Sequence, residues 1–355
     1  MHPFYDPTLT YEQNYARGPF GAFAEPAADA APPAPGNSFL GRAVGTPFGI
    51  PAGPLLNARF VAAAFAHGYD LAVYKTVRTR AHPSNPFPNV LAVHVDGDLT
   101  RDAGTVRADG EFTEPLSISN SFGVPSRDPD GWQPDMAAAV AAAGEGQLLI
   151  GSFQGTRGSG GELALVADHL RAARLVVETG AAVLELNLSC PNEGAASLLC
   201  FDTPRVRRIL AVVKDEIGDI PLLVKLAYFD TDANLERFVD ATAEFVAGYA
   251  AVNTIPARLV TASGTPALGA GRESAGVCGA AIRWAGLEMT RRLARIRTLR
   301  DADFAIVGTG GVASAADYLA YREAGADAVM SATGAMWHPE LAREVARVAR
   351  VVAAG

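Results

Sequence analysis

The chain repeats one pattern of apolar and polar positions: a short apolar run, a connection, and a longer run with helical spacing. The apolar runs are rich in Val, Ile, Leu and Ala without polar alternation, which is typical of strands buried on both faces of a parallel sheet. We predict strands at residues 47–52, 71–75, 147–152, 182–188, 221–226, 250–254, 303–308 and 326–331. We predict helices at residues 58–67, 134–143, 161–179, 203–217, 234–247, 283–297, 314–324 and 339–353.

Strands and helices that alternate in this way over 355 residues predict a (β/α)8 TIM barrel. A doubly wound open sheet is the alternative, and it is disfavoured because no G-x-G-x-x-G motif opens the first helix. Three connections are longer than a barrel needs, at residues 76–134, 189–202 and 255–282. Each follows a strand, so we expect long loops over the C-terminal face, where barrel enzymes build their sites.

The first residues do not follow the repeat. They are rich in Pro and Ala, and we predict an irregular N-terminal arm at residues 1–40 before a barrel domain at residues 41–355. A group of aromatic residues indicates that part of the arm packs on a surface: Phe4, Tyr5, Tyr11, Tyr15, Phe20 and Phe23. Packing on its own barrel is the favoured interpretation, and binding of a partner is the other.

Composition excludes several classes of protein. The formal net charge of −8 argues against binding to nucleic acid through phosphate neutralisation. The 3 Cys residues include no C-x-x-C pair, which excludes a disulfide scaffold and a self-contained metal or iron–sulfur ligand set. No apolar run approaches the ~20 residues of a membrane span, and the start is no signal peptide. We therefore expect a soluble, cytoplasmic protein without a metal, a membrane or a nucleic-acid partner.

Lysine is rare in this chain. Only three of the 30 basic residues are lysines, namely Lys75, Lys214 and Lys225. Lys75 and Lys225 close predicted strands, which would bring two ammonium groups to the mouth of the barrel. A compact point charge there could bind a phosphate, form a Schiff base or stabilise an electron-rich ring. Lys214 falls in a helical pattern and is interpreted as a solvated surface charge.

The segment ELNLSCPN places a thiol and two amides at the end of a predicted strand: Asn187, Cys190 and Asn192. A cysteine there could act as a base or nucleophile if its thiolate is stabilised, whereas Cys200 and Cys278 lack this context. Asn120 and Asn253 follow or end other strands. Several amides together suit a flat heterocycle with C=O and N–H edges.

Glycine-rich segments follow the last two predicted strands. Residues 307–312 read VGTGGV and residues 332–334 read ATG. Barrels commonly bind phosphate through backbone N–H groups in these two loops, so we expect a phosphate-bearing ligand.

Together these residues resemble the dihydroorotate dehydrogenase family, the FMN-dependent barrel enzymes of pyrimidine synthesis. The resemblance runs from about Gly41 to Val348, and its motifs are PAGPL, YKT, SNSFGVP, ELNLSCPN, VKLA, VNT and GTGGV. It implies oxidation of (S)-dihydroorotate to orotate, with hydride passing from C6 to flavin N5 and Cys190 taking the proton from C5. The cysteine resembles the class 1, cytosolic branch, because the membrane-linked class 2 branch has Ser there.

The resemblance also implies roles for individual residues. Cys190 and Lys75 would be catalytic. The substrate would be held by Asn120, Phe122, Gly123, Val124, Asn187, Asn192, Asn253 and Thr254. FMN would be held by Ala52, Gly53, Lys75, Thr76, Asn187, Lys225, Asn253, Gly279, Gly310, Gly311, Ala332 and Thr333. The chain departs from the family pattern at Asn89, where Arg is frequent, at Cys278, where Ser or Gly is usual, and at Ala332, where Gly is usual.

Other functions stay open on these residues alone. The substrate could be another dihydropyrimidine, such as a uracil-type ring, or dihydrouridine in RNA, against which the negative charge weighs. A Schiff-base aldolase built on Lys225, and a barrel that binds a nucleotide without catalysis, are further alternatives. The resemblance suggests a homodimer. The electron acceptor is left open between fumarate and NAD reached through an electron-transfer partner subunit, and quinone is less favoured by the start of the chain.

Overall fold

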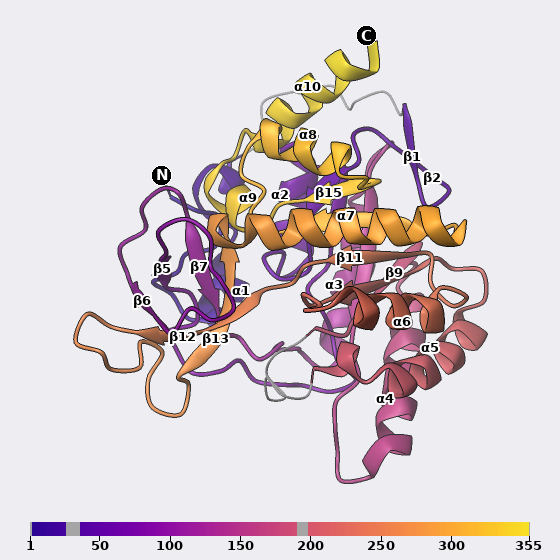
Figure 1. Ribbon diagram of the computed structural model, residues 1–355, viewed down its shortest axis with the longest axis horizontal. Helices are drawn as coiled ribbons and strands as arrows, with labels where there is room; N and C mark the ends of the chain where they lie inside the picture. The colour runs from indigo at the N-terminus through magenta and orange to yellow at the C-terminus, as the bar shows by residue number, and fades with distance from the viewer. Residues whose placement is uncertain (1, 26–35, 190–197, 355) are drawn as a thin grey trace.

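A computed structural model describes residues 2–25, 36–189 and 198–354. Its centre is a closed barrel of eight parallel strands, each hydrogen-bonded to the next in space (Figure 1). The strands are β3 (Phe48–Ile50), β4 (Leu71–Val73), β8 (Leu148–Phe153), β9 (Val183–Asn187), β10 (Leu222–Leu226), β11 (Gly248–Ala251), β14 (Ala305–Thr309) and β15 (Ala328–Met330). The TIM barrel predicted from the apolar runs is confirmed, and every predicted strand overlaps one of these.

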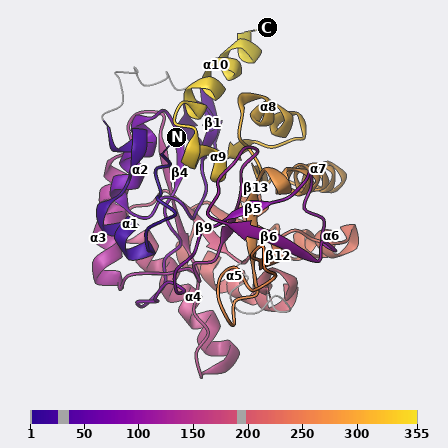
Figure 2. The same cartoon turned by 90° about the vertical axis from the view of Figure 1, so that its left-hand side faces the viewer.

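Helices alternate with the strands and cover the outside of the barrel (Figures 1 and 2). They are α2 (Ala58–Ala66), α3 (Pro129–Ala141), α4 (Gly161–Val177), α5 (Thr203–Ile217), α6 (Asp232–Thr242), α7 (Arg283–Arg300), α8 (Ala315–Glu323) and α10 (Leu341–Ala354), with the short α9 (Thr333–Trp337) before the last. The bounds of α5 agree with the prediction. Helix α3 begins five residues before the predicted Pro134, because Pro129 occupies its first turn, where a proline is tolerated. Among the described residues, no helix is long and apolar enough to cross a membrane.

The interior of the barrel changes character along its axis. An apolar cluster fills the part nearer the start of the strands, with Leu71, Leu148, Val183, Leu223 and Val307 among its members. The hairpin of β1 (Asn37–Phe39) and β2 (Arg42–Val44) adds Phe39 and Val44 to this cluster. Toward the carboxyl ends of the strands the buried side chains become polar: Lys75, Ser152, Glu185, Asn187, Lys225 and Thr309. The interior of the barrel is therefore apolar near the start of the strands and polar near their carboxyl ends.

The long connections form a second, smaller sheet. Five strands close on one another in the order β12–β13–β7–β5–β6. Figure 1 labels all five in one region beside the barrel. They are β5 (Ala92–His94), β6 (Thr105–Asp109), β7 (Ser117–Asn120), β12 (Ile255–Val260) and β13 (Ser274–Gly279). The prediction of loops for these segments missed this sheet, because β6 pairs with β12 and β7 with β13, and these partners are far apart along the chain.

The N-terminal arm packs on the barrel of its own chain, as favoured from its aromatic residues. Phe4, Tyr5, Tyr11 and Phe23 are buried. The ring of Phe4 lies 6.2 Å from that of Phe60 in α2, and the Phe4 N–H donates to the Met336 carbonyl in α9 at 3.1 Å. The arm is more regular than predicted, because Thr10 and Gln13 form a capping box that starts α1 (Tyr11–Arg17).

Candidate active site

A cavity of about 350 Å³ opens at the carboxyl ends of the barrel strands. Its walls come from the barrel, from the five-stranded sheet, which contributes Ile118 and Cys278, and from the arm, which contributes Tyr5. The volume falls within the ~300–1,000 Å³ of small-molecule and cofactor sites. The five-stranded sheet and the arm thus enclose a space that an isolated barrel would leave open.

Most of the predicted site residues line this one cavity. They are Ala52, Gly53, Lys75, Thr76, Asn120, Phe122, Val124, Asn187, Lys225, Asn253, Thr254, Gly279, Gly310, Gly311, Ala332 and Thr333. Gly123 is not among the lining residues, although both of its neighbours are. Cys190 and Asn192 lie outside the described residues. The structure therefore brings the predicted residues together, and their separate roles stay predictions.

Both cavity lysines are buried. Lys225 lies in β10, and its Nζ donates to Thr309 Oγ1 at 3.2 Å, while that hydroxyl donates to the Val252 carbonyl at 2.6 Å. Burial lowers the pKa of Lys225, and the carboxylate of Glu185 acts in the opposite direction. Lys75 lies two residues beyond the end of β4. The third lysine, Lys214, is in the last turn of α5, where its Nζ donates to the Ile220 carbonyl at 3.4 Å.

Two of the predicted amides are joined through Ser189. The Asn187 Oδ1 accepts hydrogen bonds from the backbone N–H and the hydroxyl of Ser189, both at 3.2 Å. The Nδ2 of Asn253 donates to the Ser189 hydroxyl at 3.0 Å and to its carbonyl at 3.2 Å. Asn187 ends β9 and Asn253 follows β11, so Ser189 fixes the relation of two strand ends at the rim. The residue after Ser189 is Cys190.

Residues 122–124 form a strained segment that Arg78 holds in place. Val124 has a φ of +53°, which is rare for a β-branched residue. The buried Arg78 donates through Nε to the Val124 carbonyl at 3.0 Å and through Nη2 to the Gly123 carbonyl at 3.4 Å. A third bond runs from its Nη1 to Thr156 Oγ1 at 3.0 Å. This arginine therefore positions the segment that the resemblance assigns to substrate binding.

The glycines of the rim fit a closely held planar ligand and its phosphate. Gly53 has a φ of +143°, and an added Cβ would meet nothing within 4 Å, so a side chain there would project into the cavity. Gly311 has a φ of +67°, and its added Cβ would lie 2.5 Å from the Cβ of Arg283. At Gly53 only glycine leaves the backbone open to the cavity, whereas at Gly311 only glycine lets the loop pass so close to the start of α7. With two buried ammonium groups in the same cavity, the residues present fit the FMN that the resemblance implies.

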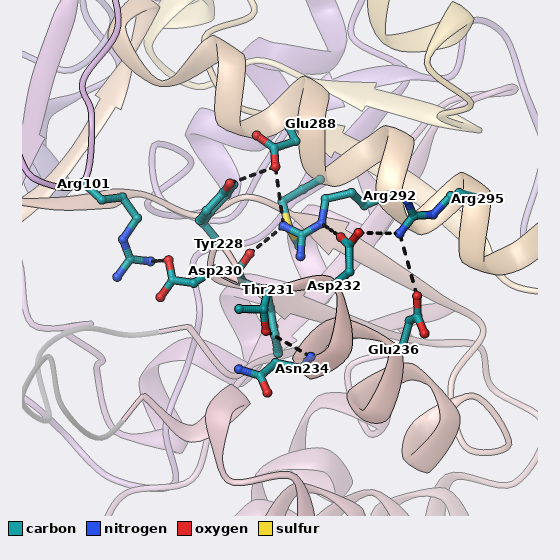
Figure 3. A network of polar contacts seen from close by, with 12 residues as sticks. Arg101, Tyr228, Asp230, Thr231, Asp232, Asn234, Glu236, Glu288, Arg292 and Arg295 are labelled. Atoms are coloured by element: carbon teal, nitrogen blue, oxygen red, sulfur yellow. Dashed lines mark hydrogen bonds and ion pairs between the residues drawn. The ribbon is translucent and has the colours of Figure 1, made fainter.

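A network of ion pairs fixes the segment that follows Lys225 (Figure 3). Arg292 of α7 donates to the Phe229 carbonyl at 2.5 Å and to Asp232 of α6 at 2.6 Å. The Tyr228 hydroxyl donates to Glu288 at 2.9 Å, and Arg101 pairs with Asp230. The end of β10 is thus tied to α6, to α7 and to the loop between β5 and β6.

Several residues of the site were missed from the sequence. Arg78 and Tyr5 carry no local signal, because their place depends on segments distant in the chain. Cys278, interpreted as structural or incidental, lines the cavity, where burial raises the pKa of its thiol to about 11. Glu185 stands inside the ELNLSCPN motif, and its spacing of two residues from Asn187 could have placed both on one strand face.

Comparison with known proteins agrees with this geometry. The model of the family described as dihydroorotate dehydrogenase matches residues 112–348. A dihydroorotate dehydrogenase of Dictyostelium discoideum is 34% identical over 96% of this chain and 95% of its own. A dihydroorotate dehydrogenase (quinone) of Thermobifida fusca is 29% identical over 88% of this chain and 78% of its own. A dihydroorotate dehydrogenase B (NAD(+)) catalytic subunit of Staphylococcus carnosus is 29% identical over 51% and 55%.

A solved structure supports the fold. The crystal structure of DHODH from Eimeria tenella in complex with ferulenol superposes with a TM-score of 0.72 at 20% identity, covering 92% of this chain and 87% of that one. The family match spans most of the chain, and the Dictyostelium relative spans nearly all of it. This chain therefore belongs to the dihydroorotate dehydrogenase family, whose members are FMN-dependent oxidoreductases acting on a CH–CH group.

Proposed function

We propose that this chain oxidises (S)-dihydroorotate to orotate, with Cys190 as the base. The observation that carries the proposal is the convergence of two lysines, three amides and the rim glycines on one cavity, beside the chain segment that leads into Cys190. The net reaction removes a hydride from C6 and a proton from C5, and it leaves a C5=C6 double bond. FMN, when bound, supplies the acceptor for the hydride.

Lys225, Lys75 and the rim glycines are proposed to hold the cofactor. The ammonium of Lys225 is fixed by Thr309 and is shielded from water, where a charge acts more strongly than at a surface. The loop that contains Gly310 and Gly311, and the start of α9 at Thr333, would offer backbone N–H groups near the ends of β14 and β15 for the phosphate. Lys75 and Thr76 line the same cavity.

The pyrimidine ring is proposed to lie against the amides. Asn187 and Asn253 are already oriented by Ser189, so they need little reorganisation to bind a ring with C=O and N–H edges. Asn120, Thr254 and the Phe122–Val124 segment would complete the contacts, and Asn192 would add a further amide. A thiol with an ordinary pKa of ~8.5 can accept the C5 proton once its thiolate is modestly stabilised.

The partner and acceptor belong to the proposal as well. We propose a class 1-like enzyme that works in the cytoplasm as a homodimer. It would pass electrons to fumarate or, through an electron-transfer partner subunit, to NAD. Its support is the cysteine at position 190. The relatives named above include one quinone enzyme and one NAD(+) catalytic subunit, so the acceptor has to be measured.

An anaerobic flavin-reduction assay tests the substrate. The FMN-loaded protein is mixed with dihydroorotate, dihydrouracil, dihydrothymine and dihydrouridine, and the loss of flavin absorbance is followed. We expect rapid bleaching by dihydroorotate alone. Bleaching by dihydrouracil and not by dihydroorotate would refute the substrate. The reduced protein is then reoxidised with fumarate, NAD and a soluble quinone, and rapid reoxidation by the quinone alone would refute the class 1 assignment.

A further inference from the structure

A buried carboxylate lies next to the cavity and has no place in the function described so far. Glu185 and Lys225 lie on neighbouring strands, β9 and β10, where Glu185 is the register partner of Leu223 and Asn187 that of Lys225. Register partners in a sheet share a face, and so do residues two apart on a strand. Leu223 packs in the apolar interior of the barrel. The side chains of Glu185 and Lys225 therefore both point inward, one layer apart.

Burial makes this arrangement costly unless the two charges support each other. Glu185 is fully buried, and Lys225 is 5% exposed. The only hydrogen bond to the Glu185 carboxylate among the described residues comes from Ser152 Oγ at 3.3 Å, and its Oε2 has no partner there. An isolated buried ion is strongly unfavourable, whereas a pair offsets much of the cost. Among the described residues, the Lys225 ammonium is the one charged group that counteracts the effect of burial on the carboxylate.

The two groups are also linked to the cavity through hydroxyls. Thr76 and Ser152 share a hydrogen bond of 2.9 Å, which continues to Glu185, and on the other side Lys225 is bonded to Thr309. Thr76, Lys225 and Thr309 line the cavity, whereas Ser152 and Glu185 do not. Glu185 is therefore placed to act on a bound ligand only through its neighbours.

We propose that Glu185 is a positioning residue: its buried carboxylate, one layer below Lys225 on the neighbouring strand, keeps the Lys225 side chain protonated at the wall of the cavity. The inference deepens the proposed function and rests on the placement of Lys225 against the cofactor. Among the described residues, the charged group acting on Glu185 is Lys225, and the one acting on Lys225 is Glu185. Burial alone lowers the pKa of Lys225 and raises that of Glu185, and each group counteracts the shift of the other. Removing the carboxylate leaves Lys225 with burial alone, so the ammonium should lose its proton at lower pH.

The rarity of lysine makes the test direct. The full-length protein is produced with 13C-labelled lysine, and the 13Cε signals of Lys75, Lys214 and Lys225 are followed against pH, with and without FMN. Lys225→Met assigns its signal. We expect Glu185→Gln to lower the midpoint of Lys225 by at least one pH unit, a tenfold change in its protonation equilibrium. In Glu185→Asp, Lys225 should titrate with a midpoint close to its midpoint in the wild type. Asp70→Asn, which removes another buried carboxylate at the opposite end of the barrel, should leave Lys225 unchanged.

A second readout uses the cofactor. The ratio of the affinities for reduced and oxidised FMN should fall in Glu185→Gln and in Lys225→Met, and the double variant should show no further loss. An unchanged Lys225 titration in Glu185→Gln overturns the proposal. A ratio of reduced-FMN to oxidised-FMN affinity that is higher in Glu185→Gln than in wild type also overturns the proposal, because it would indicate that the Lys225 ammonium stays charged without Glu185.

The folding of the variants is informative too. If Glu185→Gln alone fails to fold, the double variant Glu185→Gln/Lys225→Met should fold, because removing both partners leaves no unpaired buried charge. Failure of both to fold would also overturn the proposal. The lysine titration needs no substrate, so a protein that is not reduced by dihydroorotate, yet shows the shifted Lys225 signal, would refute the proposed substrate and support this inference.

Discussion

The clamp of Arg78 on residues 122–124 gives the sharpest prediction about substrate binding. Arg78→Met removes the hydrogen bonds to the Val124 carbonyl and to Thr156, both at 3.0 Å, and the longer one to Gly123. Hydrogen bonds to a charged group contribute about 1.5–3 kcal/mol each. The left-handed conformation of Val124, at a φ of +53°, costs about 1–3 kcal/mol and persists only if the surroundings impose it.

The loss of one strong bond therefore suffices to release the strain at Val124. We expect the segment to leave its binding conformation at a cost of about 1.5–3 kcal/mol, which lowers kcat/KM for dihydroorotate by roughly 10- to 150-fold. Arg78 does not line the cavity, so the FMN content should stay near that of wild type. Arg78→Lys should recover part of the loss, because an ammonium reaches one carbonyl without the fork of guanidinium.

Anaerobic stopped-flow reduction, with the flavin-to-protein absorbance ratio as a second measurement, checks this expectation. Arg80→Met is the matched control, because Arg80 is two residues away and exposed. Urea unfolding separates a local effect from a general loss of stability. A kcat/KM within twofold of wild type in Arg78→Met would show that the segment holds its conformation without the clamp, and the reasoning would fail.

Three further outcomes are expected. Cys190→Ala should slow flavin reduction by about 10²- to 10⁴-fold with flavin retained, and an unchanged rate would remove the thiol from the reaction. Gly311→Ala should weaken FMN binding more than tenfold in a fluorescence titration, because its Cβ would lie 2.5 Å from the first residue of α7; Gly218→Ala, also at positive φ but with open space, should bind FMN normally. Burial lowers the pKa of His169 to about 4 and raises that of Asp70 to about 6. Between those pH values, unfolding adds a proton to His169 and releases one from Asp70, so their effects on stability cancel. In Asp70→Asn the free energy of unfolding should therefore rise with pH more steeply than in wild type, by up to about 1.4 kcal/mol per pH unit, and parallel urea profiles would contradict this.

The barrel could be predicted from the sequence because the burial of each strand is visible in consecutive residues. Each parallel strand is buried on both faces, so it appears as one apolar run, and the strand that carries Lys225 is a clear example. The residues at the ends of these runs must meet at one rim, which is why the sequence alone could group Asn187, Asn253 and both cavity lysines.

The remaining features depend on contacts between distant segments. Strand β6 has alternating exposure and pairs with β12, far along the chain, so neither segment shows a buried run. Arg78 is a loop residue whose acceptors lie in two other loops. The role proposed for Glu185 depends on Lys225 on the neighbouring strand, and the two residues can be related only when the register of β9 and β10 is known.

The distribution of lysine bears on how the protein can be attached to a solid support. Two of the three lysines are buried in the cavity, and the third, Lys214, lies in the last turn of α5. That helix runs back toward the start of the strands, so Lys214 is at the end of the barrel opposite the cavity mouth. Among the lysines, an amine-reactive support should therefore couple preferentially to this one. Enzyme coupled through Lys214 would present its open rim to the solution.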